Sequence, residues 1–384
     1  MTTKDTKYLS ILDELIEKQK GDYSFQSGKI LGSMCTQAHP IAKKAYTMFL
    51  ETNLGDPDLF PGTKEIEEKV IAFQKDLMHA PSSSDGLVVS GGTEGNITAI
   101  WLATQLTGKN EIMIPESAHF SFQKIASMMK VKLTPISLTQ DFVINLKELE
   151  KKISPDTAAV VGIAGSTELG TIDPIPQLAQ LCEKRDVFLH VDAAFGGFII
   201  PFLKEMGYDV PSFDFSLSGV SSISLDAHKM GYAAIPMGTL LVREGKWLDR
   251  ITVKSLCTST YHQTGLLGTR SGGPVAASYA VFKYLGKTGY QKVVRQCMDV
   301  TMYTVEQIKE IGLPLIQDPV MNVIAIRLEH LDDIVNGLAE EGWKVNKIER
   351  LSALRLVLMP QIKKKTIDEF IPVLKKICQQ VGVL

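Results

Sequence analysis

The sequence predicts an α/β protein with a mainly parallel central sheet and a smaller C-terminal α+β domain. Short apolar runs recur through the middle of the chain, segments with helical spacing lie between them, and the rhythm changes after about residue 275. Apolar strands that alternate with helices are typical of a parallel sheet covered on both faces. The 384 residues, 45% of them hydrophobic, are enough for one large core and a second smaller one.

The elements follow one another in a regular order. The short apolar runs that we expect to be strands span residues 86–90, 111–115, 132–137, 158–165, 187–194 and 222–227. Beyond them, a long helical stretch is followed by NVIAIRL, HLDDIVNGLAEEGW, ALRLVLM and a basic amphipathic helix. We therefore expect an N-terminal segment over 1–60, a large domain over 61–275 and a small domain over 276–384.

Composition excludes several classes of protein. The 41 basic and 43 acidic side chains nearly cancel to a formal net charge of -2, which does not favour a nucleic-acid partner. The five cysteines form no Cys-x-x-Cys pair, so neither a zinc site nor a disulfide framework is indicated. The N-terminus lacks the apolar core of a signal peptide, and no apolar run is as long as a membrane span. We expect a cytoplasmic protein without a membrane segment or bound metal.

Polar residues that can bind a ligand stand at the ends of three predicted strands, where ligands of parallel sheets bind. The first strand ends in SGGTEGN, where Gly92 and Thr93 open a helix whose N–H groups can hold a phosphate. Two later strands end in HVDAAFGG, with Asp192, and SLDAHKMGY, with Lys229, a candidate Schiff-base nucleophile. Each signal alone has a structural alternative: a simple turn, a cap, and an ion pair with Asp226.

One ligand uses all three of these groups. Pyridoxal 5'-phosphate carries a phosphate, a ring nitrogen that must be protonated to act as an electron sink, and an aldehyde that condenses with an amine. A carboxylate can hold the ring N–H by a charge-assisted hydrogen bond. The phosphate cradle, the carboxylate and the lysine together therefore predict a site for pyridoxal phosphate.

The motifs around these residues resemble a known family. SGGTEGN, HFS at 119–121, GSTELGTIDPI, HVDAAFGG, DAHKMG and GTRSGG occur in the order and approximate spacing of the group II pyridoxal-phosphate decarboxylases. GKILGSMCT and NLGDPDLFPGTKEIEEKV are similar to the archaeal L-tyrosine/L-aspartate decarboxylase branch, a relative of sphingosine-1-phosphate lyase. The resemblance covers nearly the whole chain. It implies fold type I, the fold of the aspartate aminotransferase superfamily.

The resemblance implies a role for each matching residue at the centre of the site. Lys229 would form the covalent bond with the cofactor's aldehyde, and Asp192 would hold the ring nitrogen. The ring of His119 would stack on the face of the cofactor. Gly92 and Thr93 would contribute to the phosphate site.

Three further residues receive roles from the same resemblance. His228 would lie near the phosphate or the reacting centre. Thr167 would approach the phenolic oxygen of the cofactor. Arg270 would contact the carboxylate of the substrate. His190, by contrast, is interpreted as a structural residue.

The residue that returns a proton to the substrate after loss of CO2 is left open by the sequence. Many group II decarboxylases carry a tyrosine in a mobile loop that follows the lysine. Here that region reads KSLCTSTYHQTG, so either Tyr261 takes the role with a shifted loop, or His262 or His119 does. A tyrosine in such a place is equally typical of a subunit contact.

The resemblance implies two reactions. L-Tyrosine would give tyramine, as in methanofuran biosynthesis, and L-aspartate would give β-alanine, as in coenzyme A biosynthesis. An aspartate site needs a second cation, whereas a tyrosine site needs an apolar slot with a partner for the phenol. The sequence offers both kinds of side chain, namely Lys64, Arg270 and His262 against Phe60, Phe195 and Tyr261, and the balance slightly favours tyrosine.

Other functions on the same fold stay open, because the fold determines the cofactor more than the reaction. A carbon–carbon lyase of the sphingosine-phosphate-lyase type, an aminotransferase or a cysteine desulfurase could use the same lysine and aspartate. The desulfurase would need Cys257 as its nucleophile. Members of the family are generally homodimers with shared active sites, so we expect a homodimer in which residues 1–60 pack on the partner.

Overall fold

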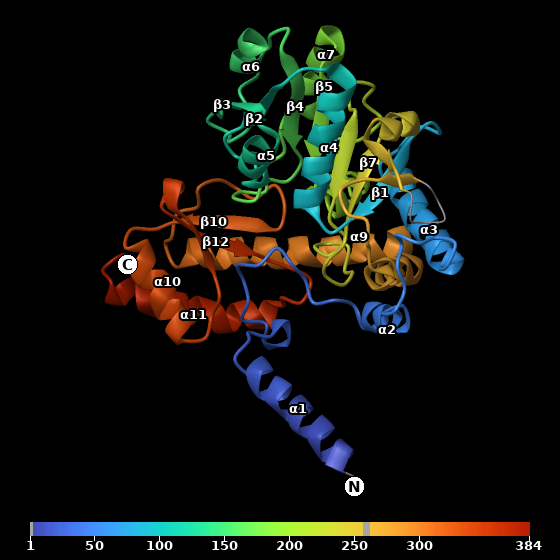
Figure 1. Ribbon diagram of the computed structural model, residues 1–384. Helices are drawn as coiled ribbons and strands as arrows, with labels where there is room; N and C mark the ends of the chain where they lie inside the picture. Colours follow the sequence, from blue (N-terminus) through green and yellow to red (C-terminus); the bar gives the residue numbers. More distant parts are fainter. Residues whose placement is uncertain (1–2, 256–261) are drawn as a thin grey trace.

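The computed structural model describes residues 3–255 and 262–384 (Figure 1). Its centre is a seven-stranded sheet in the order β1-β7-β6-β5-β4-β2-β3. The strands are β1 (Asp85–Val89), β2 (Glu111–Pro115), β3 (Lys132–Ile136), β4 (Thr157–Ile163), β5 (Phe188–Asp192), β6 (Ser222–Leu225) and β7 (Gly238–Val242). The strands from β2 to β6 are parallel, which confirms the mainly parallel sheet, and β7 runs antiparallel to β1 and β6.

All six predicted strands are present, and β7 is the strand of the central sheet that the sequence analysis missed. β4 and β5 are buried along their whole length, as expected for strands with helices on both faces. β7 has the same apolar character but the opposite direction. The reason is that no helix lies between it and β6, and parallel pairing needs a longer crossover.

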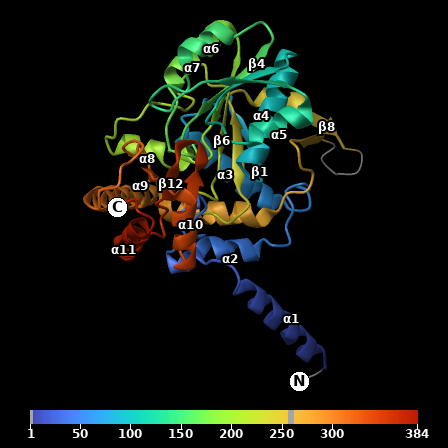
Figure 2. The same ribbon diagram turned by 90° about the vertical axis from the view of Figure 1, so that its left-hand side faces the viewer.

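Helices cover both faces of the sheet, as Figure 2 shows. α4 (Gly92–Thr107) and α5 (Ser121–Met129) pack on one face. The other face is covered by α3 (Pro61–Leu77), α7 (Ile175–Arg185), α8 (Ile200–Glu205) and the long α9 (Gly272–Glu310). α6 (Leu146–Lys152) lies between β3 and β4 in the chain, and β8 (Thr252–Lys254) pairs with β9 (His262–Thr264).

A second, smaller unit follows α9 and has a core of its own. Its antiparallel sheet has the order β10-β12-β11, formed by β10 (Val323–Arg327), β11 (Asn346–Ile348) and β12 (Ala353–Val357). α10 (Leu331–Glu340) and α11 (Lys364–Gln380) pack on it. α9 is interrupted at Gly286, whose φ of 56° is readily adopted by glycine. The smaller C-terminal α+β domain is thus confirmed.

The N-terminal segment divides into two parts. α1 (Thr3–Gln19) extends away from the rest of the molecule in both views (Figures 1 and 2) and exposes the apolar side chains of Tyr8, Leu9, Ile11, Leu12, Leu15 and Ile16. α2 (Pro40–Met48) instead packs on α9, and Leu31, Ala42 and Leu54 are buried within this chain. The apolar residues of this region therefore belong partly to the chain's own cores.

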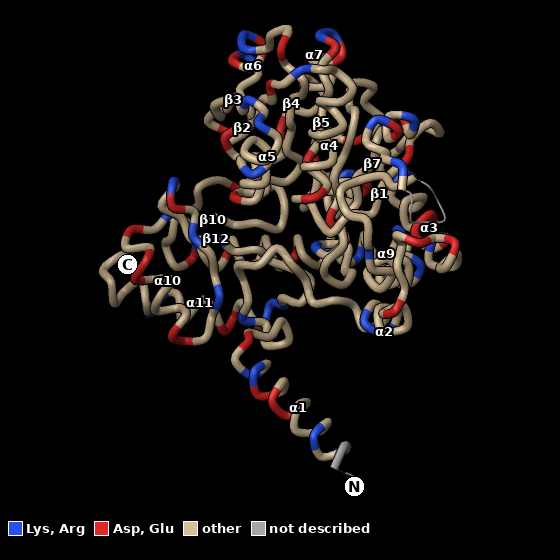
Figure 3. The backbone as a smooth tube through the Cα atoms, in the orientation of Figure 1, with Lys and Arg blue, Asp and Glu red and all other residues tan. Residues whose placement is uncertain are grey.

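Charge is spread evenly over the molecule. Lys, Arg, Asp and Glu alternate along α1 and around the rim of the large sheet, and the interior segments are mostly uncharged (Figure 3). Among the residues that the structure describes, no helix is both long and apolar enough to cross a membrane.

Candidate functional site

A cavity of about 330 Å³ opens at the carboxyl ends of the parallel strands, beside the start of α4. Parallel strands that end at one edge of a sheet bring residues distant in sequence together there. Seven of the predicted site residues line this cavity: Gly92, Thr93, His119, Thr167, Asp192, His228 and Lys229.

Lys229 lies in the loop that follows β6. Its Nζ is 3.1 Å from Oδ2 of Asp226, so the ion pair considered above is present and holds the amine in place. Burial acts to lower the pKa of Lys229, but the carboxylates of Asp226 and Asp192 outweigh it and hold that pKa above its usual value. The side chain is therefore held as an ammonium group, which must lose a proton before it can attack an aldehyde.

The first turn of α4 forms the opposite wall. Gly91 has a φ of 150°, which favours glycine, and no side chain caps the helix. A Cβ atom at Gly92 would lie 3.1 Å from Oδ2 of Asp226, and one at Gly91 would lie 3.1 Å from Cε1 of His228. Because both glycines lack a side chain, the helix N-terminus approaches the lysine loop closely enough for its N–H groups to hold an anion between them.

Asp192, at the end of β5, is mostly buried and is held by neutral donors. Its Oδ2 accepts a hydrogen bond of 2.8 Å from Nδ2 of Asn96, and its Oδ1 accepts one of 3.1 Å from the backbone N–H of Ala194. Within the described chain it forms no salt bridge. The carboxylate therefore keeps its charge available for a cationic group inside the cavity.

His190 lies in β5, two residues before Asp192, and its completely buried ring contacts Asn96. Burial lowers the pKa of His190 to about 4, although the charge of Asp192 acts in the opposite direction. The unfolded chain binds a proton at His190 below about pH 6.5 and the folded chain does not. Its contribution to stability is therefore complete above pH 6.5 and is lost as the pH falls toward 4.

This predicts that the free energy of unfolding falls by on the order of 3 kcal/mol between pH 7 and pH 4 on account of His190. Urea unfolding at several pH values would measure it, with His190→Gln as the matched variant. The difference between the two proteins separates the effect of His190 from that of Asp173. Burial raises the pKa of Asp173 to about 6, so this residue stabilises the fold as the pH falls, which is the opposite effect. Parallel pH profiles for both proteins would contradict the prediction.

His119, Thr167 and His228 surround the rest of the cavity. His119 accepts a hydrogen bond of 3.2 Å from the backbone N–H of Ser121 at Nδ1, and burial lowers its pKa, so its ring is neutral. His228 lies with Nδ1 2.7 Å from the carbonyl oxygen of Met237 and Nε2 3.8 Å from Asp226. These contacts hold each ring in one orientation at the cavity wall.

A second cavity of about 390 Å³ adjoins the first and shares His119, Thr167 and Lys229 with it. Arg355, from β12 in the smaller unit, lines it and is mostly buried. Its guanidinium donates to the carbonyl oxygens of Thr167 and Gly32, while its buried Nε has no hydrogen-bond partner. Both units of the fold thus contribute to the surroundings of Lys229.

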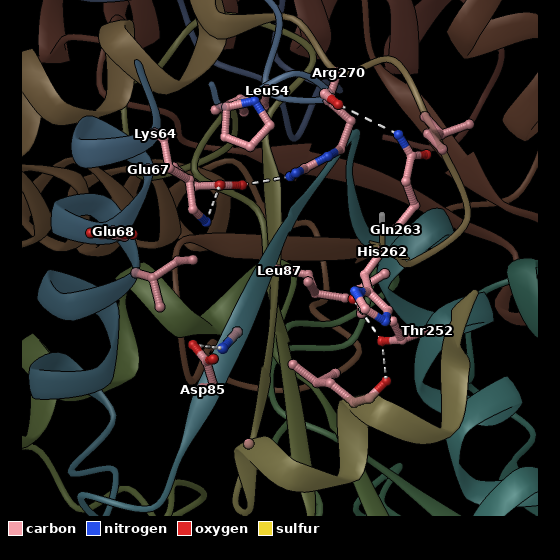
Figure 4. Close-up of a pocket in the computed structure, with 18 of the residues that line it drawn as sticks. Leu54, Lys64, Glu67, Glu68, Asp85, Leu87, Thr252, His262, Gln263 and Arg270 are labelled. Atoms are coloured by element: carbon pink, nitrogen blue, oxygen red, sulfur yellow. Dashed lines mark hydrogen bonds and ion pairs between the residues drawn. The ribbon is translucent and has the colours of Figure 1, made fainter. Parts of the chain in front are cut away.

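Arg270 does not line either of these cavities. Figure 4 shows it in a third cavity of about 510 Å³, directed at Glu67. Its Nη1 lies 2.5 Å from Oε1 of Glu67 and 3.2 Å from the carbonyl oxygen of Val88. The buried carboxylate of Glu67 attracts this cation. Within this chain Arg270 therefore lies away from Lys229, contrary to the expectation that it contacts the carboxylate of the substrate.

Two residues of the site were missed by sequence reasoning. Asn96 stands one helical turn after Gly92, on the buried face of α4, and Arg355 interrupts the apolar run ALRLVLM. A polar residue at a position that periodicity assigns to the core was the signal in both cases. Tyr261 and Cys257 lie outside the described residues.

The first cavity fits pyridoxal phosphate. The start of α4 can hold the phosphate, Asp192 has its charge available for the ring N–H, and Lys229 supplies the amine. Oδ1 of Asp226 is buried there with no described partner, so the wall also offers an acceptor that the protein alone does not use. Among the described residues, no three His, Cys, Asp or Glu side chains are grouped so that they could hold a metal ion.

Comparisons with known proteins agree with this geometry. Residues 36–329 match the model of the pyridoxal-dependent decarboxylase conserved domain. The chain is 43% identical over 376 residues to the L-aspartate decarboxylase of Thermococcus kodakarensis, covering 97% of each protein. It is 43% identical over 349 residues to the probable L-tyrosine/L-aspartate decarboxylase of Methanothermobacter thermautotrophicus, covering 90% of this chain and 96% of the relative.

The fold has counterparts among solved structures. The sphingosine-1-phosphate lyase of Burkholderia pseudomallei superposes with a TM-score of 0.88 at 24% identity, covering 99% of this chain and 91% of that one. The family match spans most of the chain and includes the lysine, the carboxylate and the glycine turn of the cavity. The chain therefore belongs to the pyridoxal-dependent decarboxylase family and is a pyridoxal-phosphate-dependent amino-acid carboxy-lyase.

Proposed function

We propose that this enzyme decarboxylates L-aspartate to β-alanine. The observation that carries the proposal is the charge of the second cavity, whose lining includes Lys229, Lys344 and Arg355 and no acidic residue. A substrate with two carboxylates matches two cations beyond the reactive lysine. β-Alanine formed in this way would serve coenzyme A biosynthesis in the cytoplasm.

L-Tyrosine, which the sequence slightly favours, fits this lining less well. Ile30 and Met34 are apolar, but apart from His119 the described lining contains no aromatic ring for a phenol to pack on. Lys344 has no ion-pair partner in the described chain, and its Nζ lies 4.2 Å from the ring centroid of Tyr23. A cation without an ion pair favours a carboxylate over an uncharged phenol.

The roles of the residues follow from their positions. Pyridoxal phosphate supplies the electron sink that stabilises the carbanion left by CO2. Lys229 would bind its aldehyde, Asp192 would hold its ring N–H, and the turn at Gly92 and Thr93 would hold its phosphate, with His228 beside it. Each of these residues then acts on a different atom of one ligand.

The walls of the cavity have the remaining roles. His119 would pack on the face of the ring, and Thr167 would lie by its phenolic oxygen. Arg355 would bind one carboxylate of the substrate in place of Arg270, because its guanidinium lines the cavity that contains Lys229. Tyr261 would return the proton to carbon, and His119 is the alternative donor because it lines both cavities.

The test is a substrate comparison on the purified holoenzyme. We expect CO2 and β-alanine from L-aspartate, with kcat/KM at least about 100-fold above that for L-tyrosine. The reason is that the side chain of tyrosine has no carboxylate to pair with the second cation of the cavity. Mass spectrometry of the amine products measures this, and Lys344→Met should reduce the value for aspartate. If tyramine were the main product and Lys344→Met left kcat/KM for tyrosine unchanged, L-tyrosine would replace L-aspartate as the proposed substrate.

We further propose a homodimer with shared active sites. The exposed apolar face of α1 supports it, because a helix with unburied Leu12, Leu15 and Ile16 has no partner within this chain. Light scattering should give twice the chain mass of 42.3 kDa. An active monomer would contradict this proposal without affecting the assignment of the substrate.

A further inference from the structure

A cluster of buried polar side chains surrounds Asp192 and joins two strands of the large sheet to two helices that cover it. Its members come from α4, α5, β5 and β6, and each is at most 1% exposed: Asn96, Ser121, His190, Ser222 and Ser224. Buried polar groups are costly unless their hydrogen bonds are made, so a cluster of this size must be internally satisfied.

Asn96 stands at the centre of the cluster and uses its full hydrogen-bonding capacity. Its Nδ2 donates to Oδ2 of Asp192 at 2.8 Å and to Oγ of Ser121 at 3.1 Å. Its Oδ1 lies 2.9 Å from Nε2 of His190 and accepts a bond of 2.9 Å from Oγ of Ser224. Two donor hydrogens and two acceptor lone pairs are all used, so the amide has one orientation.

The direction of each bond follows from Asp192. An ionised carboxylate can only accept, so Nδ2 of Asn96 must face it and Oδ1 must face His190. His190 therefore carries its proton on Nε2, and its Nδ1 accepts from the hydroxyl of Ser222 at 2.8 Å. A neutral imidazole in one tautomer completes a chain of hydrogen bonds that runs from β6 to the carboxylate.

We infer that Asn96 is a positioning residue that, through this chain, directs the carboxylate of Asp192 at the ring nitrogen of pyridoxal phosphate. The inference rests on the proposed role of Asp192. The physical reason is that a short hydrogen bond from a neutral amide fixes the orientation of the carboxylate and leaves its negative charge available. A salt bridge to an arginine or lysine would neutralise that charge. Among the described contacts, the second donor to this carboxylate is the backbone N–H of Ala194, which is neutral as well.

The experiment compares two cofactors. Apoenzyme is titrated with pyridoxal phosphate and with its analogue that has carbon in place of the ring nitrogen, and both dissociation constants are measured by absorbance. Only the natural cofactor can use Asp192, so the ratio of the two constants reports on that bond alone. We define the ratio as the dissociation constant of the analogue divided by that of pyridoxal phosphate. It should fall about tenfold or more in Asn96→Ala and in the nearly isosteric Asn96→Leu, because neither side chain can donate the charge-assisted bond to the carboxylate.

Thr98→Val is the matched control. Thr98 lies on the same helix, is completely buried, and its Oγ1 has no described partner, so this variant changes a buried residue of α4 without breaking a hydrogen bond. The ratio should equal that of the wild type. Thermal melting of every apoenzyme reports the loss of stability separately, and Asn96→Leu, which fills the same space, provides the second variant if Asn96→Ala does not fold.

The outcomes separate the inference from the proposed function. If the Asn96 variants weaken both cofactors equally and leave the ratio unchanged, Asn96 is only structural and the inference is overturned. If the wild type itself shows no preference for the natural cofactor, the proposed role of Asp192 is wrong and the inference is overturned with it. A large wild-type ratio that falls in both Asn96 variants but not in Thr98→Val supports the inference.

Discussion

Replacing Lys229 with alanine is expected to abolish the covalent attachment of the cofactor and to lower kcat by at least about 10³-fold. Lys229 lines both cavities and is the lysine held 3.1 Å from Asp226 at the end of β6. The turn of α4 and Asp192 are untouched by the substitution, so pyridoxal phosphate should still bind, although more weakly. Visible absorbance of the dialysed enzyme and CO2 release measure the two effects.

Lys229→Arg separates the charge from the chemistry. Removing the lysine also leaves the carboxylate of Asp226 buried without its cation, which by itself destabilises the protein. Arginine retains a positive charge for Asp226 but cannot condense with an aldehyde. We expect the arginine variant to melt closer to the wild type than the alanine variant and to be equally inactive. Appreciable turnover by either variant would refute the role of Lys229.

Replacing Arg355 with methionine is expected to lower kcat/KM for L-aspartate by about 10²- to 10⁴-fold, since a buried carboxylate of the substrate would lose its cation. Binding of pyridoxal phosphate should change little, because Arg355 does not line the cavity of Asp192 and the α4 turn. Steady-state kinetics together with cofactor titration would show this pattern. Equal losses in kcat/KM and in cofactor affinity would indicate general damage to the site.

Arg355→Lys and Arg270→Lys form the matched pair of controls. The guanidinium of Arg355 also donates to the carbonyl oxygens of Gly32 and Thr167, so lysine there keeps the charge but loses the forked geometry. We expect an intermediate loss. In Arg270→Lys the ion pair with Glu67 can re-form, and kcat/KM should stay within a few-fold of the wild type. A greater loss in Arg270→Lys than in Arg355→Lys would restore Arg270 as the substrate residue.

The sequence was sufficient for the architecture and for the centre of the site. Apolar runs of strand length that alternate with helical spacing identify a parallel sheet, and the ends of such strands meet at one edge. Gly92, Asp192 and Lys229 could therefore be placed together although 137 residues separate the first from the last (229 minus 92). β7 was missed although it is as apolar as the parallel strands beside it, and nothing in its composition reveals its antiparallel direction.

Only the tertiary structure determined which charged and polar groups approach one another across elements. Arg270 stands in a motif that suggested substrate binding, yet the buried carboxylate of Glu67 holds it in another cavity. Arg355 comes to the lysine from a strand of the smaller unit, and Asn96 reaches Asp192 from the next layer. Periodicity along a chain states which face of an element is buried. It does not state which partner is buried against that face, because that depends on how separate elements pack.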